Sequence, residues 1–427
     1  MKAIKQILFD FRHQAVISWV TLSGTMLSVF LIMIVVMMQQ VQIAPFAPES
    51  NRDRLLYGRW MHVNTGEGLG GSSSSVSLTY AHQLYDSLAN VEVISFVVDQ
   101  SDREVASLKG KLPMIVDKKM VDDNYWKIFN HSFIYGKPFD RAQFDAGMKV
   151  AVITESVAKE LFNRTDVVDR ELLLNHVPYK VTGVIKDVSS LTTEAYGQVF
   201  IPWTTNNSLT DWNKPYFGNA MVYLLARSPK DIESIRKEVE HRYEVLNTQD
   251  RGDNSTFIYH GQPFTQEMRV NEHGSNNDPD IETPRKMRYF IFAILLIIPA
   301  INLSSMTQSR LRRRVGEFGV RRAFGCTRSR IMLDILNENL ILTIAGGILG
   351  VLLSLGFTWL FSDLMFTSMF DDRSPESMYI TPEMVFNLPI FLWTLLFCLI
   401  LNILSASIPA WRAARVNPVE AINMGNK

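Results

Sequence analysis

The side chains best suited to specific polar contacts form a dense basic group between two long apolar runs. The segment 310–330 holds eight arginines and a single acid, Glu317. The arginines are Arg310, Arg312, Arg313, Arg314, Arg321, Arg322, Arg328 and Arg330. A short basic loop between apolar runs is the pattern that marks the cytoplasmic side of a membrane protein. The chemistry it indicates is ion pairing with anionic lipid or with a protein, rather than bond making or breaking.

Apolar residues set among the arginines narrow this interpretation. A solvated loop that fixes topology and touches membrane lipid explains the charge, but it does not explain Val315, Phe318 and Phe324. The following residues, 328–340, have the spacing of a helix with one apolar face. A helix that docks on a partner protein explains both the charge and the apolar residues. Nucleic-acid binding is the third alternative, and the position beside an apolar run disfavours it.

Motifs for catalysis and metal binding are missing from the sequence. The eight histidines are scattered without an i, i+4 pair, and there is no Cys/His cluster or GxSxG elbow. The glycine- and serine-rich stretch 66–75 lacks the GK[ST] ending of a phosphate-binding loop, and we expect an ordinary loop there. We therefore expect no catalytic, cofactor-binding or metal-binding residues on this chain, and no enzyme activity of its own.

Four uncharged runs are long enough to cross a bilayer as helices. They occupy residues 16–38, 289–309, 339–362 and 384–411. The first run is too long for the apolar part of a cleaved signal peptide, so it is expected to stay as an anchor. The positive-inside rule places the N-terminal residues 1–15, the loop 310–338 and the tail 412–427 in the cytoplasm, and the block 39–287 and the short loop 363–383 in the periplasm. The expected location is the inner membrane, with several passes.

The long block 39–287 is predicted to be an α+β domain, because segments with strand and helix patterns alternate along it. Strands are predicted at 91–98, 150–154, 171–174, 177–188, 198–202 and 220–225, and helices at 78–90, 155–162 and 231–246. The two cysteines, Cys326 and Cys398, lie outside this block, so its core must hold by packing alone. The predicted fold is therefore four transmembrane helices with a large extracytoplasmic α+β domain between the first and the second.

Small and polar residues inside the apolar runs predict close contacts between helices. Gly346, Gly347, Gly350 and Ser354 recur at a spacing of three to four residues, which favours packing within the chain or across a dimer. Asn302 and Asn402 also lie inside apolar runs. We interpret them as helix-packing residues, with a transport pathway as the alternative.

Three stretches of the sequence resemble one family of membrane proteins. The run 317–325 (EFGVRRAFG), followed by an amphipathic helix and a Gly-rich span, is similar to the signature of the MacB/FtsX/LolE permeases of ABC transporters. The stretch 408–422 (IPAWRAARVNPVEAI) resembles the terminal motif of that family and includes Pro409, Arg412 and Pro418. In the outer block, GKPFD, VAVITESVAKELF and LLLNHVPYKVTGVIKDV resemble the periplasmic core domain of MacB-type members. Residues 289–420 would then form an FtsX-like permease domain.

The resemblance implies a coupling role for the basic loop. The chain would be one half of a dimer with a second copy or a paralogue, and its loop would seat on a cytoplasmic ABC ATPase that binds ATP and Mg²⁺. Glu317, Arg321 and Arg322 would make polar contacts with the ATPase, Phe318 and Phe324 would pack beside them, and Gly319 and Gly325 would let the backbones approach. Because the chain shows no Walker motif and begins close to its first span, we expect the ATPase on a separate polypeptide.

The resemblance also implies a task on the periplasmic side. ATP hydrolysis would drive the outer domain through the spans, a process called mechanotransmission, to export or extract a hydrophobic compound, a peptide or a lipoprotein. A periplasmic adaptor and an outer-membrane channel are further partners that the resemblance allows. Two alternatives stay open: an FtsX-like signalling subunit that controls a cell-wall hydrolase, and a membrane sensor or scaffold that works without an ATPase.

Overall fold

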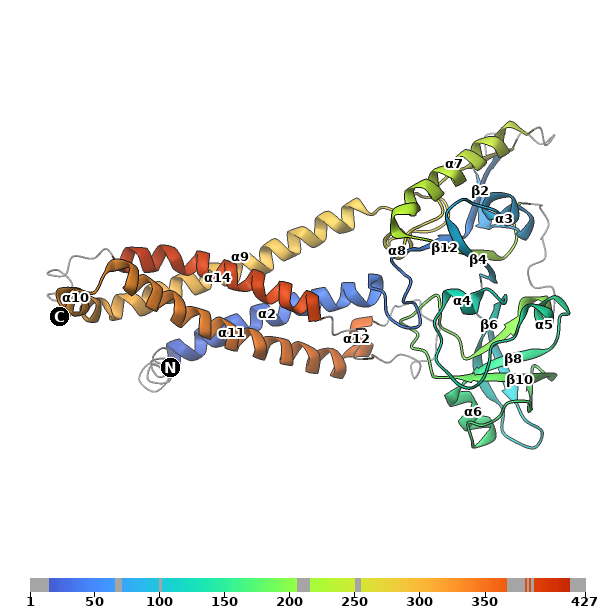
Figure 1. Cartoon of the computed structure of the whole chain (residues 1–427), viewed down its shortest axis with the longest axis horizontal. Coiled ribbons are helices and arrows are strands. Elements are labelled where there is room, and N and C mark those ends of the chain that lie inside the picture. Colours follow the sequence, from blue (N-terminus) through green and yellow to red (C-terminus); the bar gives the residue numbers. More distant parts are fainter. Residues whose placement is uncertain are drawn as a thin grey trace. The chain divides into compact units, whose positions relative to one another are not determined.

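The computed structural model describes residues 15–65, 71–99, 102–205, 216–249, 255–366, 381, 384 and 388–414. It divides into two compact units (Figure 1). The helical unit comprises residues 1–40, 285–367 and 381–427, and the outer unit comprises residues 41–284 and 368–380. The predicted loop 363–383 falls largely outside the described residues.

Among its described residues, the helical unit consists of long helices and two short ones that connect them. Its helices are α2 (Ala15–Ile43), α9 (Glu282–Arg313), α10 (Val315–Ala323), α11 (Arg328–Leu360), α12 (Ser362–Phe366) and α14 (Leu388–Ala414). Within the described residues, Leu22–Ile43 and Arg328–Leu360 are long and apolar enough to cross a membrane. The other two predicted spans coincide with α9 and α14, and their crossing stays a prediction.

Helix α11 differs from the sequence prediction. We expected an amphipathic helix over 328–340 and a separate span over 339–362, but the structure has one continuous helix of 33 residues from Arg328 to Leu360. At 1.5 Å per residue it is about 50 Å long, which exceeds the hydrocarbon core of a bilayer. The helix continues because no proline interrupts residues 328–360.

A ring of paired strands forms one half of the outer unit. Its seven-stranded sheet has the order β7 (Phe133–Gly136), β10 (Val177–Ile185), β8 (Val150–Thr154), β11 (Val199–Pro202), β6 (Met114–Val121), β5 (Asp102–Ser107) and β9 (Glu171–Leu174). Strand β9 pairs antiparallel with both β5 and β10, so the sheet closes on itself as a barrel. The β10–β8 and β11–β6 pairs are parallel. The short helices α4 (Tyr125–Ile128), α5 (Arg141–Asp145) and α6 (Glu155–Phe162) and the 3₁₀ turn η1 (Trp203–Thr205) accompany this barrel.

Two three-stranded sheets form the other half of the outer unit, which we call the sheet half. One has the order β1 (Leu55–Gly58), β12 (Ala220–Ala226) and β4 (Val91–Val98), and the other β13 (Ser255–Ile258), β2 (Trp60–Thr65) and β3 (Ser72–Ser75). Helices α3 (Leu78–Tyr85), α7 (Ile232–Thr248) and α8 (Gln266–Val270) and the 3₁₀ turn η2 (Pro229–Asp231) belong to this half. Both sheets are antiparallel throughout.

The predicted elements from residue 150 to 248 are confirmed with small shifts at their ends. Strand β8 and helix α6 match the predicted bounds. The predicted hairpin turn at Asn175 and His176 is present, and both residues have positive φ angles, 47° and 68°, as a tight hairpin requires. One prediction was wrong: Ser72–Ser75 form strand β3, because the backbone of β2 pairs with them despite their loop-like composition.

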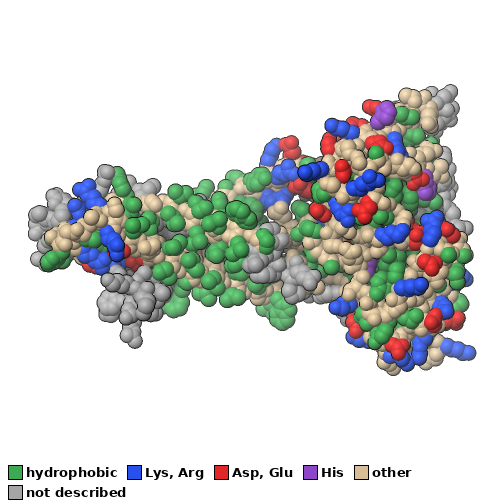
Figure 2. All heavy atoms as spheres, viewed as in Figure 1, with side chains coloured by type: hydrophobic (Ala, Val, Ile, Leu, Met, Phe, Trp, Pro, Cys, Tyr) green, Lys and Arg blue, Asp and Glu red, His purple; other side chains and the backbone are tan. Residues whose placement is uncertain are grey.

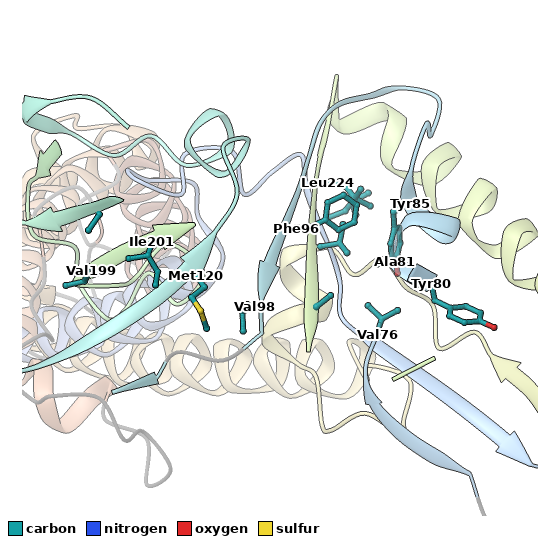
Figure 3. Close-up of a cluster of buried hydrophobic side chains, with 14 of the residues drawn as sticks. Val76, Tyr80, Ala81, Tyr85, Phe96, Val98, Met120, Val199, Ile201 and Leu224 are labelled. Carbon is teal, nitrogen blue, oxygen red and sulfur yellow. The ribbon is translucent and has the colours of Figure 1, made fainter. Parts of the chain in front are cut away.

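The two halves of the outer unit share buried apolar side chains (Figure 3). Tyr85 from α3 lies beside Phe96 and Leu224 in the sheet half, and Met120 and Ile201 lie on the barrel strands. All of these side chains belong to one contiguous cluster, which also includes most inward-facing residues of β8 and β10. The outer unit therefore folds around shared packing and does not depend on disulfides.

Candidate functional site

Helix α10 is the centre of the candidate site. It spans nine residues and ends at Ala323, and Gly325 just beyond it has a φ of +88°, a left-handed conformation that glycine adopts without strain. The amide N–H of Gly325 donates to the carbonyl of Arg322, and the N–H of Cys326 donates to the carbonyl of Arg321. Thr327 then begins α11, because its hydroxyl accepts the N–H of Arg330 at 3.4 Å. The end of α10 and the start of α11 are therefore both fixed by hydrogen bonds, and the turn between the two helices is short.

A buried arginine fixes the start of α10. Arg314 Nε donates to Glu317 Oε2, and Arg314 Nη1 donates to Glu338 Oε2, both at 2.9 Å. Glu317 Oε1 also accepts from Arg321 Nη2 at 2.5 Å, and Arg321 Nη1 lies 3.7 Å from Asp334 Oδ2. These contacts connect the first turn of α10 with the first three turns of α11. The network thus makes α10 a rigid extension of α11.

The charges in this network stabilise one another. Burial alone would lower the pKa of Arg314, but Glu317 and Glu338 outweigh it and raise that pKa. Burial alone would raise the pKa of Glu317, but Arg314 and Arg321 hold it below its ordinary value. Both groups are therefore ionised at neutral pH, as a charge-assisted pair requires.

The two phenylalanines of the predicted coupling motif lie in different environments. Phe318 is only 5% exposed and packs in an apolar cluster with Leu311, Ile331 and Ile335. Phe324 is 88% exposed at the end of α10. We had expected both rings to face a partner, but the Phe318 ring lies inside the helical unit. Phe324 is therefore the aromatic side chain that this segment presents.

The remaining predicted coupling residues follow the same division. Gly319 is buried within α10, which explains why a small residue stands there, whereas Gly325 is exposed with open space where a Cβ would be. Arg321 and Arg322 are half-buried. Figure 2 shows basic side chains gathered at one end of the helical unit, while the rest of its visible face is largely hydrophobic. Basic side chains are thus concentrated at the α10 end.

The predicted helix-packing glycines lie in two contacts along α11. A Cβ on Gly346 would lie 2.9 Å from Thr25 Cβ, and a Cβ on Gly350 would lie 2.6 Å from the carbonyl oxygen of Met26, both on α2. A Cβ on Gly347 would instead lie 2.7 Å from Leu395 Cδ1 on α14. Ser354 is buried on the same helix and donates to the carbonyl of Val351. The glycines thus let α11 lie against α2 on one side and α14 on the other.

Some predicted residues lie outside what the structure describes. The side chains of Asn302, Asn402, Pro409 and Arg412 are outside the described part of their helices, and Pro418 lies in the undescribed range 415–427. Their proposed roles stay predictions. The structure also adds residues that no sequence pattern singled out. Arg314 and Glu338 form the buried pair described above, and nothing in their spacing of 24 residues indicates it.

Comparison with known proteins decides the family. The model of the MacB-like periplasmic core domain matches residues 18–242, which is more than half of the chain. The model of the FtsX-like permease C-terminal domain matches residues 289–418. The chain belongs to the MacB/FtsX family of ABC transporter permeases. The two matches occur in the order expected from the sequence, with the outer domain before the permease domain.

Individual relatives are similar at low identity. The chain is 23% identical to a protein described as an uncharacterized ABC transporter permease, YknZ of Bacillus subtilis, over 82% of this chain and 80% of that protein. It is 24% identical to the macrolide export ATP-binding/permease protein MacB 1 of Yersinia pestis over 98% of this chain. The chain spans 61% of that longer relative and 42% of the pyoverdine export ATP-binding/permease protein PvdT of Pseudomonas syringae.

Solved structures of outer domains are also similar to this chain. The periplasmic region of MacB from Actinobacillus actinomycetemcomitans matches 51% of this chain and 94% of that domain, with 14% identity and a TM-score of 0.35. The extracellular domain of YknZ matches 48% of this chain and 100% of that domain, with a TM-score of 0.33.

Proposed function

We propose that this permease couples ATP hydrolysis on a separate cytoplasmic ABC ATPase to movement of its outer domain. The task would be export or extraction of a hydrophobic compound, a peptide or a lipoprotein. Four spans, with both termini in the cytoplasm and the outer unit in the periplasm, provide the path for this movement. A second copy of the chain or a paralogue would complete the permease, and ATP and Mg²⁺ would bind to the ATPase.

The observation that carries the proposal is the exposure of Phe324 on a rigid helix. An exposed aromatic ring at the end of an element is a typical anchor for a pocket on a partner protein. The Arg314 network ties α10 to α11, and α11 is a single helix long enough to cross the membrane. A force applied at Phe324 would therefore be passed directly to a membrane helix, without a flexible loop between them.

The electrostatics of the segment fit the same partner. Arg321, Arg322, Arg328 and Arg330 surround the exposed ring in sequence, and they give the α10 end a positive surface. Such a surface would steer an acidic face of a partner toward the ring and set its orientation. Glu338 pairs with Arg314, and Glu317 pairs with Arg314 and Arg321, but the segment 310–330 holds eight arginines against this one acid, so its net charge stays positive.

Co-purification from native membranes tests the coupling. The tagged chain would be isolated in mild detergent, and bound proteins carrying Walker motifs would be identified and quantified. We expect Phe324→Ala to reduce the recovered ATPase about tenfold or more, as loss of an aromatic hot spot does. The matched control is Met287→Ala, which removes an apolar side chain of 59% exposure. Met287 lies near the start of α9, at the opposite end of that helix from α10. Equal recovery with both variants, or no ATPase with the wild type, would contradict the proposal.

Topology is tested separately by labelling. Single cysteines in place of Leu112 in the outer unit and of Val320 on α10, which are 91% and 47% exposed, should react with a membrane-impermeant reagent from opposite sides of the membrane in a cysteine-free background. Reaction from the same side would exclude the proposed arrangement of the four spans. This measurement does not depend on the ATPase, so it separates an error in topology from an error in coupling.

A further inference from the structure

The two halves of the outer unit enclose a cleft. It has a volume of about 520 Å³, within the range of small-molecule sites in proteins. One wall comes from the sheet half, through His82 on α3, Asp86 directly after it, and β4. The other wall comes from the barrel, through α4, α5 and η1. Junctions between two subdomains are common places for ligand sites.

Aromatic side chains provide the apolar surface of this cleft. Phe96 lies on the sheet side, and Phe144 and Trp203 lie on the barrel side with their rings 5.0 Å apart in an edge-to-face arrangement. The Trp203 indole N–H donates to the carbonyl of Phe96 at 3.1 Å, which ties the two walls together. Phe96 and Phe144 are only 8% and 4% exposed, so the apolar surface open to a ligand is small and lies mainly at the half-buried Trp203.

The charges at the mouth of the cleft are largely paired with one another. Asp86 lies 2.7 Å from His82, and Asp145 lies 2.9 Å from Arg141. Glu92 lies 2.6 Å from Arg54. These groups are exposed to solvent, so each pair contributes little to binding.

Asp122 is different, because it is a buried acid without a basic partner. Its side chain is nearly enclosed, with 4% of the residue exposed, and no Lys, Arg or His lies within 4.0 Å of it among the described residues. Oδ1 accepts from Ser95 Oγ at 2.6 Å and from the Tyr125 N–H at 2.9 Å, and Oδ2 accepts from the Phe96 N–H at 2.9 Å. A carboxylate has about four acceptor positions, so one position on Oδ2 is left for a ligand.

We propose that the cleft binds an organic cation with an apolar body, whose ammonium group pairs with Asp122 while the body lies against Phe96, Phe144 and Trp203. An ammonium supplies both the missing charge and the missing hydrogen bond. The aromatic rings add apolar contact and favourable cation–π interaction. As a step in transport this site rests on the proposed function, but binding itself is measured without the ATPase.

The ionisation of Asp122 supports the pairing. Burial raises its pKa to about 7, although the hydrogen bonds from Ser95, Phe96 and Tyr125 act in the opposite direction. A cation that binds the ionised form should therefore bind more tightly as pH rises from 6 to 8, by about fivefold or more. The other charged groups of the cleft are Asp86, Glu92, Lys127, Arg141 and Asp145, together with His82. Because histidines also change charge in this range, the pH series is repeated with His82→Gln.

Two dansyl probes that differ in one group test the proposal on the full chain. Dansylcadaverine carries a terminal ammonium, and N-hexyl dansylamide, whose chain has the same length, ends in a methyl group. Binding would be measured by fluorescence polarisation in phosphatidylcholine nanodiscs, with empty nanodiscs subtracted, because this lipid has no net charge. We expect the wild type to bind the cation about tenfold more tightly than the neutral probe. Equal binding of the two probes would overturn the proposal.

Three variants assign the preference to Asp122. Asp122→Asn should abolish the preference for the cation, and Asp169→Asn should keep it. Asp169 is an exposed acid outside the cleft, and its positive φ of 65° suits asparagine. Lys127→Gln removes an exposed positive charge from the cleft and should tighten binding of the cation about threefold. This gain cannot arise from misfolding, so it places the cation in the cleft even if Asp122→Asn fails to fold. A folded Asp122→Asn that keeps the preference, or a Lys127→Gln that leaves it unchanged, would overturn the assignment.

Discussion

Arg314 Nη1 and Glu338 Oε2 lie 2.9 Å apart, although 24 residues separate the two in the chain. The pair is buried where α10 meets α11, and Arg314 engages Glu317 at the same time. Removing one member of such a pair leaves the other charge buried without a partner, and this costs about 3–5 kcal/mol. The pair therefore fixes the angle between α10 and α11.

We expect Glu338→Gln to lower the thermal stability of the helical unit, because Arg314 then loses a charged partner in a buried place. The loss should be at the lower end of about 3–5 kcal/mol, since Glu317 remains. Thermal unfolding in detergent measures it. The control is Asp334→Asn, which weakens an exposed contact of 3.7 Å with Arg321 and should cost less than about 1 kcal/mol. Equal effects of the two variants would mean that the buried pair does not hold α10.

A second prediction concerns the contact between α11 and α2. Gly350→Ala places a Cβ 2.6 Å from the Met26 carbonyl oxygen, so the helices must move apart. We expect a loss of about 1–3 kcal/mol, as for other overpacked sites. Gly356→Ala on the same helix meets nothing within 4 Å and should be neutral or stabilising by up to about 1 kcal/mol. If thermal unfolding shows both variants to be alike, the contact with α2 is not as close as the structure indicates.

Elements with a strong local signal could be predicted from the sequence. Strand β8 and helix α6 follow from an unbroken buried run and a 3.6-residue period, and the β9–β10 hairpin follows from Asn175 at its turn. Most strands in the first part of the outer unit were not predicted from the sequence. There β3 is a run of four serines, and β5 carries three charged residues. Such strands form because neighbouring strands pair with them, which is information that one segment of sequence does not contain.

Prediction of the candidate site from the sequence has the same limit. The arginines, the exposed Phe324 and the small residues of α11 were all recognisable from their types and spacing. The sequence could not distinguish Phe318 from Phe324, because the burial of Phe318 depends on Leu311, Ile331 and Ile335, which lie on other helices. It could not select Asp122 either, since its environment is made by Ser95 and Phe96 on a strand of the other half.

A buried ionic network in the outer unit leads to the third prediction. Arg269 Nε lies 3.0 Å from Glu194 Oε1, and Arg269 Nη1 lies 2.7 Å from Glu272 Oε2. Glu194 also accepts from the Tyr223 hydroxyl at 2.9 Å. Arg269→Met leaves both acids without this partner and should destabilise the outer unit by about 3–5 kcal/mol. Adding Glu194→Gln should recover part of the loss.

The control for this network is an exposed pair. Arg164→Met breaks the surface contact with Asp166 and should cost less than about 1 kcal/mol. Chemical denaturation of the full chain, followed by the fluorescence of the tryptophans, compares Arg269→Met, Glu194→Gln, the double variant and Arg164→Met. If the double variant is as unstable as the sum of the single variants, Arg269 and Glu194 act independently and the network is not a unit.

The fourth prediction is a dependence of stability on pH that arises from His131. Its ring lies among Tyr125, Trp126 and Phe200, and its Nδ1 is buried without a hydrogen-bond partner. Burial, together with the positive charge of Lys119, lowers the pKa of His131 from 6.5 to about 3. Between these two values the unfolded chain binds a proton that the folded chain does not, so acid favours unfolding. The wild type should therefore lose about 2 kcal/mol between pH 8 and pH 5 through this residue alone.

The variant His131→Phe tests this prediction, because phenylalanine fills the aromatic site and cannot take up a proton. Its free energy of unfolding should fall less than that of the wild type between pH 8 and pH 5, by about 2 kcal/mol. His241→Phe is the matched control, since the His241 side chain is 72% exposed on α7 and should leave the wild-type pH dependence unchanged. Denaturant unfolding of the full chain at the two pH values gives the comparison. If His131→Phe and the wild type show the same pH dependence, the folded chain protonates His131 as readily as the unfolded chain does. That result would contradict the prediction.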